Sequence, residues 1–375
     1  MKRKNKVAIA IFAAYMPPHV GGIERYTSNL VKQFLDLGYQ PIVVTSNYDG
    51  EKEFEVVDGV VMIRLPIYET FKNRYPIVKL GNKKKELMRL LDDYNIKAII
   101  VNTRFHLTSH VGVSYAKHHN IPVYLIEHGS NYVTLDNKFI DFFANRYEDI
   151  LTFRLKNKIA GFYGVSEACG KWLKHFKIEA TGTWYNSIDF KQDVLEKIPH
   201  EGINFLYAGR IIKQKGVYNI LMAFKELSLK YENINLYIAG DGSELETYKR
   251  EFNYKGIYFL GKLEYDELVK YYANCDVFLY PPLWPEGLPT SILEAGLMRC
   301  AVIGTDQGGI KEIISNGENG LIISGEIKDL KKAMELLIKN EDLRKKYADV
   351  LYETVRDKFS WEVTAKKIVK DIKLK

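Results

Sequence analysis

Residues 277–295 read VFLYPPLWPEGLPTSILEA and carry the strongest signal in the chain. The apolar run Val277–Tyr280 is typical of a buried strand, and a proline- and glycine-rich loop leads from it into a helix-forming stretch. Pro289 fits the first position of that helix, where a missing N–H group costs nothing. A strand followed by a loop and a helix is the unit from which parallel sheets are built.

The same alternation continues through most of the chain. Apolar spacing near 3.6 residues, as in Ile23–Leu37 and Asn219–Leu229, predicts helices between the strands. The strand candidates are Val7–Ala13, Pro41–Thr45, Val60–Leu65, Ala98–Asn102, Pro122–Ile126, Gly161–Val165, Asn204–Ala208, Ile234–Ala239, Ile257–Leu260, Val277–Tyr280 and Ala301–Gly304. Alternating strands and helices favour α/β architecture with right-handed crossovers.

The alternation is interrupted once, in the polar stretch Phe190–Gly202, and begins again near residue 203. A chain of 375 residues is also too long for one ordinary core. We therefore expect two Rossmann-like domains in tandem. Ligands of such sheets bind at the carboxyl ends of the strands, so the loops that directly follow strands are the candidate sites.

Two carboxylates flank the start of the helix in the segment quoted first. Glu286 lies in the loop, and Glu294 lies between one and two turns into the helix. A carboxylate accepts two hydrogen bonds from a vicinal diol, so Glu294 suits a ribose and Glu286 a sugar ring. The free N–H groups around Leu288–Ser291, together with the helix dipole, favour a phosphate. An ordinary helix with a surface glutamate is the alternative.

Two further loops follow predicted strands. Residues 207–216 read YAGRIIKQKG, in which Arg210 and Lys215 could converge on a diphosphate. Residues 16–24 read MPPHVGGIE, and the paired glycines would let backbone N–H groups approach a phosphate or a sugar. Each loop alone is also compatible with a plain turn. The loop at residues 16–24 does not match the GxGxxG motif of dinucleotide-binding proteins, and no acidic residue follows about 20 positions later. Both observations argue against a nicotinamide dinucleotide as the ligand.

Taken in order, these segments resemble family 4 of the GT-B glycosyltransferases, a retaining group that includes bacterial polysaccharide enzymes. Besides Trp284–Ala295, the resemblance rests on Gly21-Gly22, Glu127-His128-Gly129, Val165-Ser166-Glu167, Tyr185-Asn186-Ser187-Ile188-Asp189, Gly209-Arg210 with Lys215-Gly216, Ala239-Gly240-Asp241-Gly242 and Gly308-Gly309. It implies two Rossmann-like domains that face each other across a cleft. Residues 1–188 would bind the acceptor and 189–359 the donor, with a C-terminal helix at about 360–375 packing back on the first domain.

The resemblance also implies roles for single residues. Glu294 would bind the donor ribose, Glu286 the transferred sugar, and Arg210 with Lys215 the diphosphate. His128 matches a histidine near the anomeric centre that orients the donor sugar; a structural histidine at a strand end is the alternative. The remaining donor-binding positions that the resemblance implies are Gly21, Gly22, Gly261, Lys262, Leu263, Gly287, Leu288, Pro289 and Thr290.

The implied reaction moves a hexosyl group from a nucleotide-diphosphate sugar to a saccharide acceptor, as in the EC 2.4 class. UDP-sugars are favoured and GDP-sugars come next. Ser187 and Pro289 stand where many relatives have glycine, which weakens a choice of donor. The sequence contains no DxD motif, so we expect neither a metal nor a cofactor, with positive side chains stabilising the leaving diphosphate. A sugar-nucleotide epimerase or a phosphorylase on the same fold is the alternative.

The charge of the chain is unevenly distributed. Residues 1–190 contain 26 Lys and Arg against 19 Asp and Glu, whereas residues 191–375 contain 28 of each kind. With aromatic-rich segments at 66–80 and 130–158, this surplus favours a lipid-linked acceptor at an anionic membrane surface, in capsule or exopolysaccharide synthesis; a soluble sugar is the alternative. The two basic groups are Lys83, Lys84, Lys85 and Arg89, and Arg146, Arg154, Lys156 and Lys158. No nucleic-acid-binding signature accompanies them.

The remaining composition predicts a globular protein of the cytoplasm. Three cysteines, Cys169, Cys275 and Cys300, lie far apart and form no CxxC pair, which favours a reducing compartment. No apolar run reaches the 18 or more residues that a membrane-spanning helix needs. The apolar Val7–Ala14 after the basic N-terminus is interpreted as a first strand and not as a signal peptide.

Overall fold

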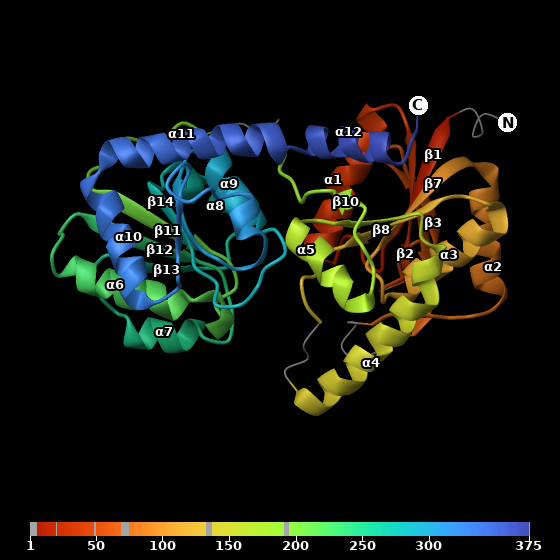
Figure 1. Cartoon of the computed structure of the whole chain (residues 1–375), viewed down its shortest axis with the longest axis horizontal. Helices are drawn as coiled ribbons and strands as arrows, with labels where there is room; N and C mark the ends of the chain where they lie inside the picture. The colour runs from red at the N-terminus through yellow and green to blue at the C-terminus, as the bar shows by residue number, and fades with distance from the viewer. Residues whose placement is uncertain are drawn as a thin grey trace. The chain divides into compact units, whose positions relative to one another are not determined.

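The computed structural model describes residues 6–19, 21–48, 50–68, 75–132, 137–190 and 195–374. Parts of the predicted acceptor segments, residues 69–74 and 133–136, lie outside these ranges. The chain divides into two compact units (Figure 1), the first made of residues 1–185 and 361–375 and the second of 186–360. Each unit is a Rossmann-like α/β domain, which confirms the predicted fold class.

The sheet of the first domain has the order β10-β9-β8-β7-β1-β2-β4-β3 within the described residues. Its strands are β1 (Val7–Phe12), β2 (Gln40–Ser46), β3 (Phe54–Val57), β4 (Val60–Leu65), β7 (Asn95–Asn102), β8 (Val123–Glu127), β9 (Gly161–Gly164) and β10 (Gly182–Thr183). Neighbouring strands pair in parallel, except that β3 runs antiparallel to β4. A separate antiparallel pair is formed by β5 (Ile67–Tyr68) and β6 (Ile77–Val78).

Helices cover both faces of this sheet, so the side chains of β1 alternate between two cores. Ala10 and Phe12 belong to one core, and Ile9 and Ile11 to the other. This two-sided burial is why the strands read as continuous apolar runs. The helices are α1 (Gly22–Asp36), α2 (Asn82–Arg89), α3 (Leu107–His119), α4 (Lys138–Leu155), α5 (Glu167–Trp172) and α12 (Trp361–Asp371).

The C-terminal helix α12 belongs to the first domain. Trp361 and Ile368 are buried in the same core as Tyr26 of α1. The indole Nε1 of Trp184 donates a hydrogen bond of 2.8 Å to the Asp371 carboxylate. Helix α12 therefore packs on the first domain, although it follows the second domain in the sequence.

The second domain has a fully parallel sheet in the order β13-β12-β11-β14-β15-β16. Its strands are β11 (Ile203–Ala208), β12 (Ile234–Ala239), β13 (Ile257–Gly261), β14 (Val277–Tyr280), β15 (Ala301–Thr305) and β16 (Leu321–Ile323). Its helices are α6 (Val217–Ser228), α7 (Leu245–Glu251), α8 (Tyr265–Ala273), α9 (Thr290–Leu297), α10 (Ile327–Lys339) and α11 (Glu341–Lys358).

Both sheets contain a point at which the strand order reverses. In the second domain it lies between β11 and β14, and in the first domain between β1 and β7. Ligands of doubly wound sheets bind in the crevice at the carboxyl ends of such strands. The loops after these four strands contain Gly21, Arg104, Lys215 and Glu286.

Candidate functional site

The loops after β11 and β14 meet through an ion pair at the reversal point of the second domain. Lys215 Nζ lies 2.6 Å from Glu286 Oε1 and 3.1 Å from the Tyr280 hydroxyl. Lys215 is buried, which opposes its charge, but Tyr280 and Glu286 outweigh burial and raise the pKa of the lysine. The ammonium group is therefore held charged beside a carboxylate at the edge where a ligand is expected.

Glycines allow the surrounding loops to pack backbone against backbone. Gly216 has φ +72°, and a Cβ there would come within 2.1 Å of the Pro281 carbonyl oxygen. Gly308 has φ +59°, and a Cβ there would lie 1.8 Å from the Glu286 carbonyl oxygen. The Gly309 N–H donates to the Gly287 carbonyl at 3.0 Å. These contacts fix the backbone on both sides of the Lys215–Glu286 pair.

Helix α9 begins directly behind this loop. Pro289 is its N-cap, with φ −74° and ψ 113°, and its carbonyl accepts a hydrogen bond from Ile292 N at 3.2 Å. The prediction that Pro289 occupies the first helical position is therefore wrong by one residue, because its extended ψ leaves Thr290 to begin the helix. The Leu288 carbonyl accepts a hydrogen bond of 3.3 Å from Asn186 Nδ2.

Glu294 lies inside α9, one turn from its start, and is only 6% exposed. Burial and the neighbouring Glu294 charge raise the pKa of Tyr272 well above its ordinary value. The carboxylate thus lies beside a neutral phenol in a largely dry environment. A polar ligand that reached it would gain a strong, charge-assisted hydrogen bond.

The other predicted donor residues of this domain occupy the same edge of the sheet. Arg210 is exposed, and its carbonyl accepts a hydrogen bond of 2.8 Å from the Tyr207 hydroxyl. Gly261 ends β13 with φ +70°, and its carbonyl accepts from Gly240 N at 2.7 Å. Lys262 is exposed and Leu263 half-buried beyond it. The structure thus brings Lys215, Tyr280 and Glu286 into direct contact and leaves the Arg210 guanidinium open to solvent.

Beside the reversal point of the first domain lies a histidine, His128, which directly follows β8. His128 Nε2 lies 2.8 Å from Asn102 Oδ1, while Asn102 Nδ2 donates to Thr27 Oγ1 at 3.0 Å. Because Oδ1 can only accept, neutral His128 carries its proton on Nε2 and offers Nδ1 as an acceptor. Burial, with a contribution from His106, lowers the pKa of His128 to about 3. The imidazole is therefore uncharged near neutral pH.

The paired glycines lie at the start of α1 in the same domain. Gly21 is the N-cap with extended backbone, and Gly22 is the first helical residue. A Cβ on Gly21 would come within 2.4 Å of Glu24 Oε2. Glu24 is buried and lies 2.9 Å from His19 Nδ1. The glycine therefore makes room for a carboxylate that the sequence analysis did not single out.

Neither domain contains an obvious metal centre among the residues that the structure describes. No group of three or more His, Cys, Asp or Glu side chains in those ranges is arranged to hold an ion. The three cysteines are free and buried.

Comparison with known proteins identifies the family. The family described as Glycosyltransferase Family 4 matches residues 20–192, and that described as Glycosyl transferases group 1 matches residues 190–353. The chain is a GT-B glycosyltransferase of the family 4 type. The two matches meet at residues 190–192, close to the division between the two structural units.

Three relatives illustrate the similarity of this glycosyltransferase to known proteins. Uncharacterized glycosyltransferase MJ1069 of Methanocaldococcus jannaschii is 28% identical over 387 residues, which cover 98% of both chains. The capsular polysaccharide biosynthesis glycosyltransferase CapM of Staphylococcus aureus is 29% identical over 196 residues, 49% of this chain and 50% of CapM. The crystal structure of Anabaena Alr3699/HepE in complex with UDP-glucose superposes with a TM-score of 0.73 at 15% identity, covering 98% of this chain and 100% of HepE.

The glycosyltransferase also contains a buried ionic cluster that the sequence analysis missed. Arg104 Nη1 lies 2.9 Å from Glu127 Oε2, and Nη2 lies 2.6 Å from Glu148 Oε2. All three side chains are at most 1% exposed. Glu127 Oε1 also accepts from Gly129 N at 3.1 Å, so the cluster holds both residues that flank His128. The only available signal was the polar Asn102-Thr103-Arg104 directly after an apolar strand.

Proposed function

We propose that this enzyme is a retaining hexosyltransferase that uses a nucleotide-diphosphate sugar without a metal ion. The Lys215–Glu286 pair at the reversal point of the second sheet, in which the lysine is buried and the glutamate half-buried, carries this proposal. A diphosphate that approached Lys215 would meet a cation held at 2.6 Å from Glu286, which in turn suits the hydroxyls of the transferred sugar. Preorganised charge of this kind stabilises a leaving group without reorganisation.

The other donor contacts follow from the same geometry. Glu294 would bind the ribose hydroxyls from within α9, whose first N–H groups favour a phosphate. Arg210 would add a second cation, and the Gly22 N–H a hydrogen bond, to the diphosphate. Neutral His128 would accept a hydrogen bond at Nδ1 from a hydroxyl group of the donor sugar. UDP-sugars are the first donors to test, because HepE is similar in fold and its structure holds UDP-glucose.

The reaction itself needs no dedicated base. The acceptor hydroxyl oxygen attacks the anomeric carbon from the face of the leaving group, the bond to the phosphate oxygen breaks, and the departing phosphate takes the hydroxyl proton. Attack on that face retains the configuration. Lys215 and Arg210 would stabilise the negative charge that develops on the diphosphate.

For the acceptor we propose a saccharide, carried on a lipid, in the synthesis of a surface polysaccharide. Similarity to CapM, whose name includes capsular polysaccharide biosynthesis, supports the pathway. Support for a membrane surface comes from α4, on which aromatic side chains are exposed between basic residues. The exposed aromatic residues are Phe139, Phe142, Phe143 and Phe153, with exposed fractions of 56–73%.

Of the two basic groups, the one at residues 146–158 around α4 is better suited than the one at residues 83–89 to contact an anionic leaflet at the cytoplasmic face. Lys83 of the other group is paired with Glu53 at 2.7 Å, and burial lowers the pKa of Lys84. Around α4, Arg154 and Lys156 line an open hollow of about 610 Å³, and Lys156 lies 5.1 Å from the Phe153 ring centre. No helix in the described ranges is long and apolar enough to cross a membrane.

A panel of nucleotide sugars tests the proposal without knowledge of the acceptor. We expect slow hydrolysis of one donor in the presence of EDTA, with release of the nucleoside diphosphate. Conversion of the donor into a second nucleotide sugar would indicate an epimerase instead. Absorbance near roughly 400 nm from a lysine-bound pyridoxal phosphate would indicate a phosphorylase. Activity that requires added magnesium or manganese would overturn the metal-free mechanism.

A further inference from the structure

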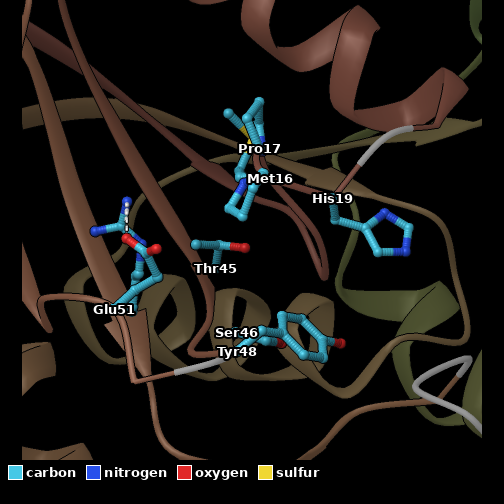
Figure 2. A pocket seen from close by; sticks show the side chains of 9 residues that line it. Met16, Pro17, His19, Thr45, Ser46, Tyr48 and Glu51 are labelled. Carbon is cyan, nitrogen blue, oxygen red and sulfur yellow. Dashed lines mark ion pairs between the residues drawn. The ribbon is translucent and has the colours of Figure 1, made fainter.

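The first domain contains a cavity of about 260 Å³ that no predicted donor residue lines. It lies at the carboxyl ends of β1 and β2, against β4 (Figure 2). Thr45 lies between Glu51 on one side and His19 and Tyr48 on the other, with Met16 and Pro17 above it in this view. The cavity is smaller than the roughly 300–1,000 Å³ of typical small-molecule sites, so it suits a single ring.

Two buried hydroxyl groups in the wall of this cavity form no hydrogen bonds within the described ranges. The side-chain oxygens of Thr45 and Ser46, residues that are 1% and 3% exposed, have no partner in the part of the chain that the structure describes. Unpaired buried polar groups are rare, because removing them from water without replacing the hydrogen bond is costly. Hydroxyls can both donate and accept, so a ligand that carries several hydroxyls would satisfy them.

The charge around the cavity argues against an anionic ligand. Arg64 Nη1 lies 2.6 Å from Glu55 Oε1 and donates to the Lys52 carbonyl at 2.8 Å. Arg64 Nη2 lies 3.8 Å from Glu51 Oε2. Two carboxylates thus offset one guanidinium, and Glu51, whose side chain is 40% exposed, can accept hydrogen bonds from a ligand. A phosphate or a uronic acid carboxylate would meet repulsion here.

The apolar part of the wall suits the C–H face of a sugar. Tyr48 is held by stacking on Tyr15, with ring centres 5.6 Å apart, and Tyr15 also stacks on His19 at 4.6 Å. Pro17 and Met16 add further apolar surface. The cavity therefore combines a fixed aromatic ring, unpaired hydroxyls and a carboxylate.

We propose that this cavity is the subsite for one neutral sugar unit of the acceptor. The inference rests on the proposed glycosyl transfer for its role, but binding of the sugar can be measured without turnover. Thr45 and Ser46 would hydrogen-bond the ring hydroxyls, Glu51 would accept from a third, and Tyr48 would contact the apolar face.

Methyl NMR provides a direct test, because Met16 lines the cavity and the chain has only seven methionines. The protein, labelled at methionine methyl groups, is titrated with methyl glycosides of neutral hexoses and N-acetylhexosamines, and separately with inorganic phosphate. We expect at least one glycoside to shift the Met16 signal, identified with Met16→Leu, and phosphate to leave it unchanged. Met298 and Met334 of the second domain serve as references and report folding.

Substitutions then locate the contacts. Thr45→Val and Ser46→Ala should each weaken glycoside binding by about 2- to 10-fold, the value of one lost hydrogen bond. Ser114→Ala, at an exposed position of α3, is the matched control and should bind normally. The proposal is overturned if no glycoside moves Met16, if phosphate does so instead, or if both variants bind as the wild type does. Donor hydrolysis in the same samples distinguishes the sugar subsite from the proposed glycosyl transfer. If a donor is hydrolysed but no glycoside shifts the Met16 signal, only the subsite is excluded. If a glycoside shifts the Met16 signal but no donor is hydrolysed, the cavity binds a sugar that is not a transferase acceptor.

Discussion

The two domains share the order of their six central parallel strands but differ in the chemistry near the point where that order reverses. In the second domain, the loops after β11 and β14 bring together a charged pair, Lys215 and Glu286, at 2.6 Å. In the first domain, neutral His128 follows β8 and lies against Asn102 at the end of β7, while the Thr45 hydroxyl in β2 has no hydrogen-bond partner among the described residues. Topology thus determines where a ligand binds, and the loop side chains determine its charge. We therefore propose a diphosphate as the ligand of one edge and an uncharged sugar as that of the other.

The largest effect should come from the buried cluster that holds the histidine loop. Arg104→Ala leaves Glu127 and Glu148 buried without their counter-charge, so we expect a loss of about 3–5 kcal/mol in the free energy of unfolding. Urea denaturation measures it. Arg146→Ala, which removes an exposed pair with Asp149, should cost at most about 1 kcal/mol. Equal losses for the two variants would show that the buried cluster has no special role.

The second-largest effect is expected at the Lys215–Glu286 pair of the second domain. Lys215→Ala removes the cation that we propose for the leaving diphosphate and should lower kcat by about 100- to 1,000-fold, as loss of one preorganised donor does in other enzymes. Lys213→Ala changes an exposed lysine in the same short turn and is the matched control. Turnover should be measured in EDTA. Comparable rates for the two variants would remove Lys215 from the mechanism.

The third effect separates nucleotide binding from turnover. Glu294→Ala should weaken binding of the free nucleoside diphosphate by about 1.5–3 kcal/mol, the value of a charged hydrogen bond. Calorimetry measures it, with Glu232→Ala at an exposed position of the same domain as the control. Thermal unfolding of both variants checks that they fold. Unchanged affinity in a folded Glu294→Ala variant would exclude the ribose contact.

The fourth prediction concerns how the stability of the first domain depends on pH through His106 and His128. Burial, with the nearby Arg104, lowers the pKa of His106 to about 3, and burial with His106 does the same for His128. Below a pH of about 6.5 the unfolded chain binds more protons than the folded one, so stability falls as pH falls towards 3. At pH 5 each histidine should cost about 2 kcal/mol relative to pH 7. His106→Gln should remove one such contribution in urea titrations at both pH values, with His118→Gln, at an exposed position of α3, as the control substitution.

The smallest effect is expected at the surface of α4. Each basic residue near an anionic leaflet contributes about 1 kcal/mol, and the attraction fades within roughly 8 Å at physiological salt. Changing Arg146, Arg154, Lys156 and Lys158 to Ser should therefore reduce co-sedimentation with anionic vesicles. The same change at Lys83, Lys84, Lys85 and Arg89 should have less effect. Wild-type protein that remains in the supernatant at low salt would exclude the membrane and favour a soluble acceptor.

Sequence patterns predicted the regular parts of both domains well. The central strands of the second domain are recognisable because they are buried on both faces, as Ile203–Ala208 and Val277–Tyr280 show. Strand β3 was missed, since it lies at an edge and exposes Val56 and Val57, so no continuous apolar run marks it. Apolar sequence patterns reflect the burial of side chains, and an edge strand buries too few side chains to produce such a pattern.

Side-chain partners across the sheet were less predictable than the strands. The sequence placed Glu286 and Lys215 at strand ends, but their direct pairing depends on β11 and β14 being neighbours. The Arg104 cluster joins residues 23 and 44 positions apart on different elements. Thr45 and Ser46, whose hydroxyls lack a partner in the described part of the chain, lie at the end of an apolar strand and resemble ordinary strand residues. Such contacts follow from strand order, which local patterns do not encode.

The central claim is metal-free transfer with retention, and the anomer first released from the donor tests it most directly. Proton NMR of wild-type protein with its preferred nucleotide sugar in EDTA would follow hydrolysis before the free sugar equilibrates. We predict that the first sugar to appear has the same anomeric configuration as the donor. An inverted first product, or hydrolysis that appears only after a divalent metal is added, would contradict the account.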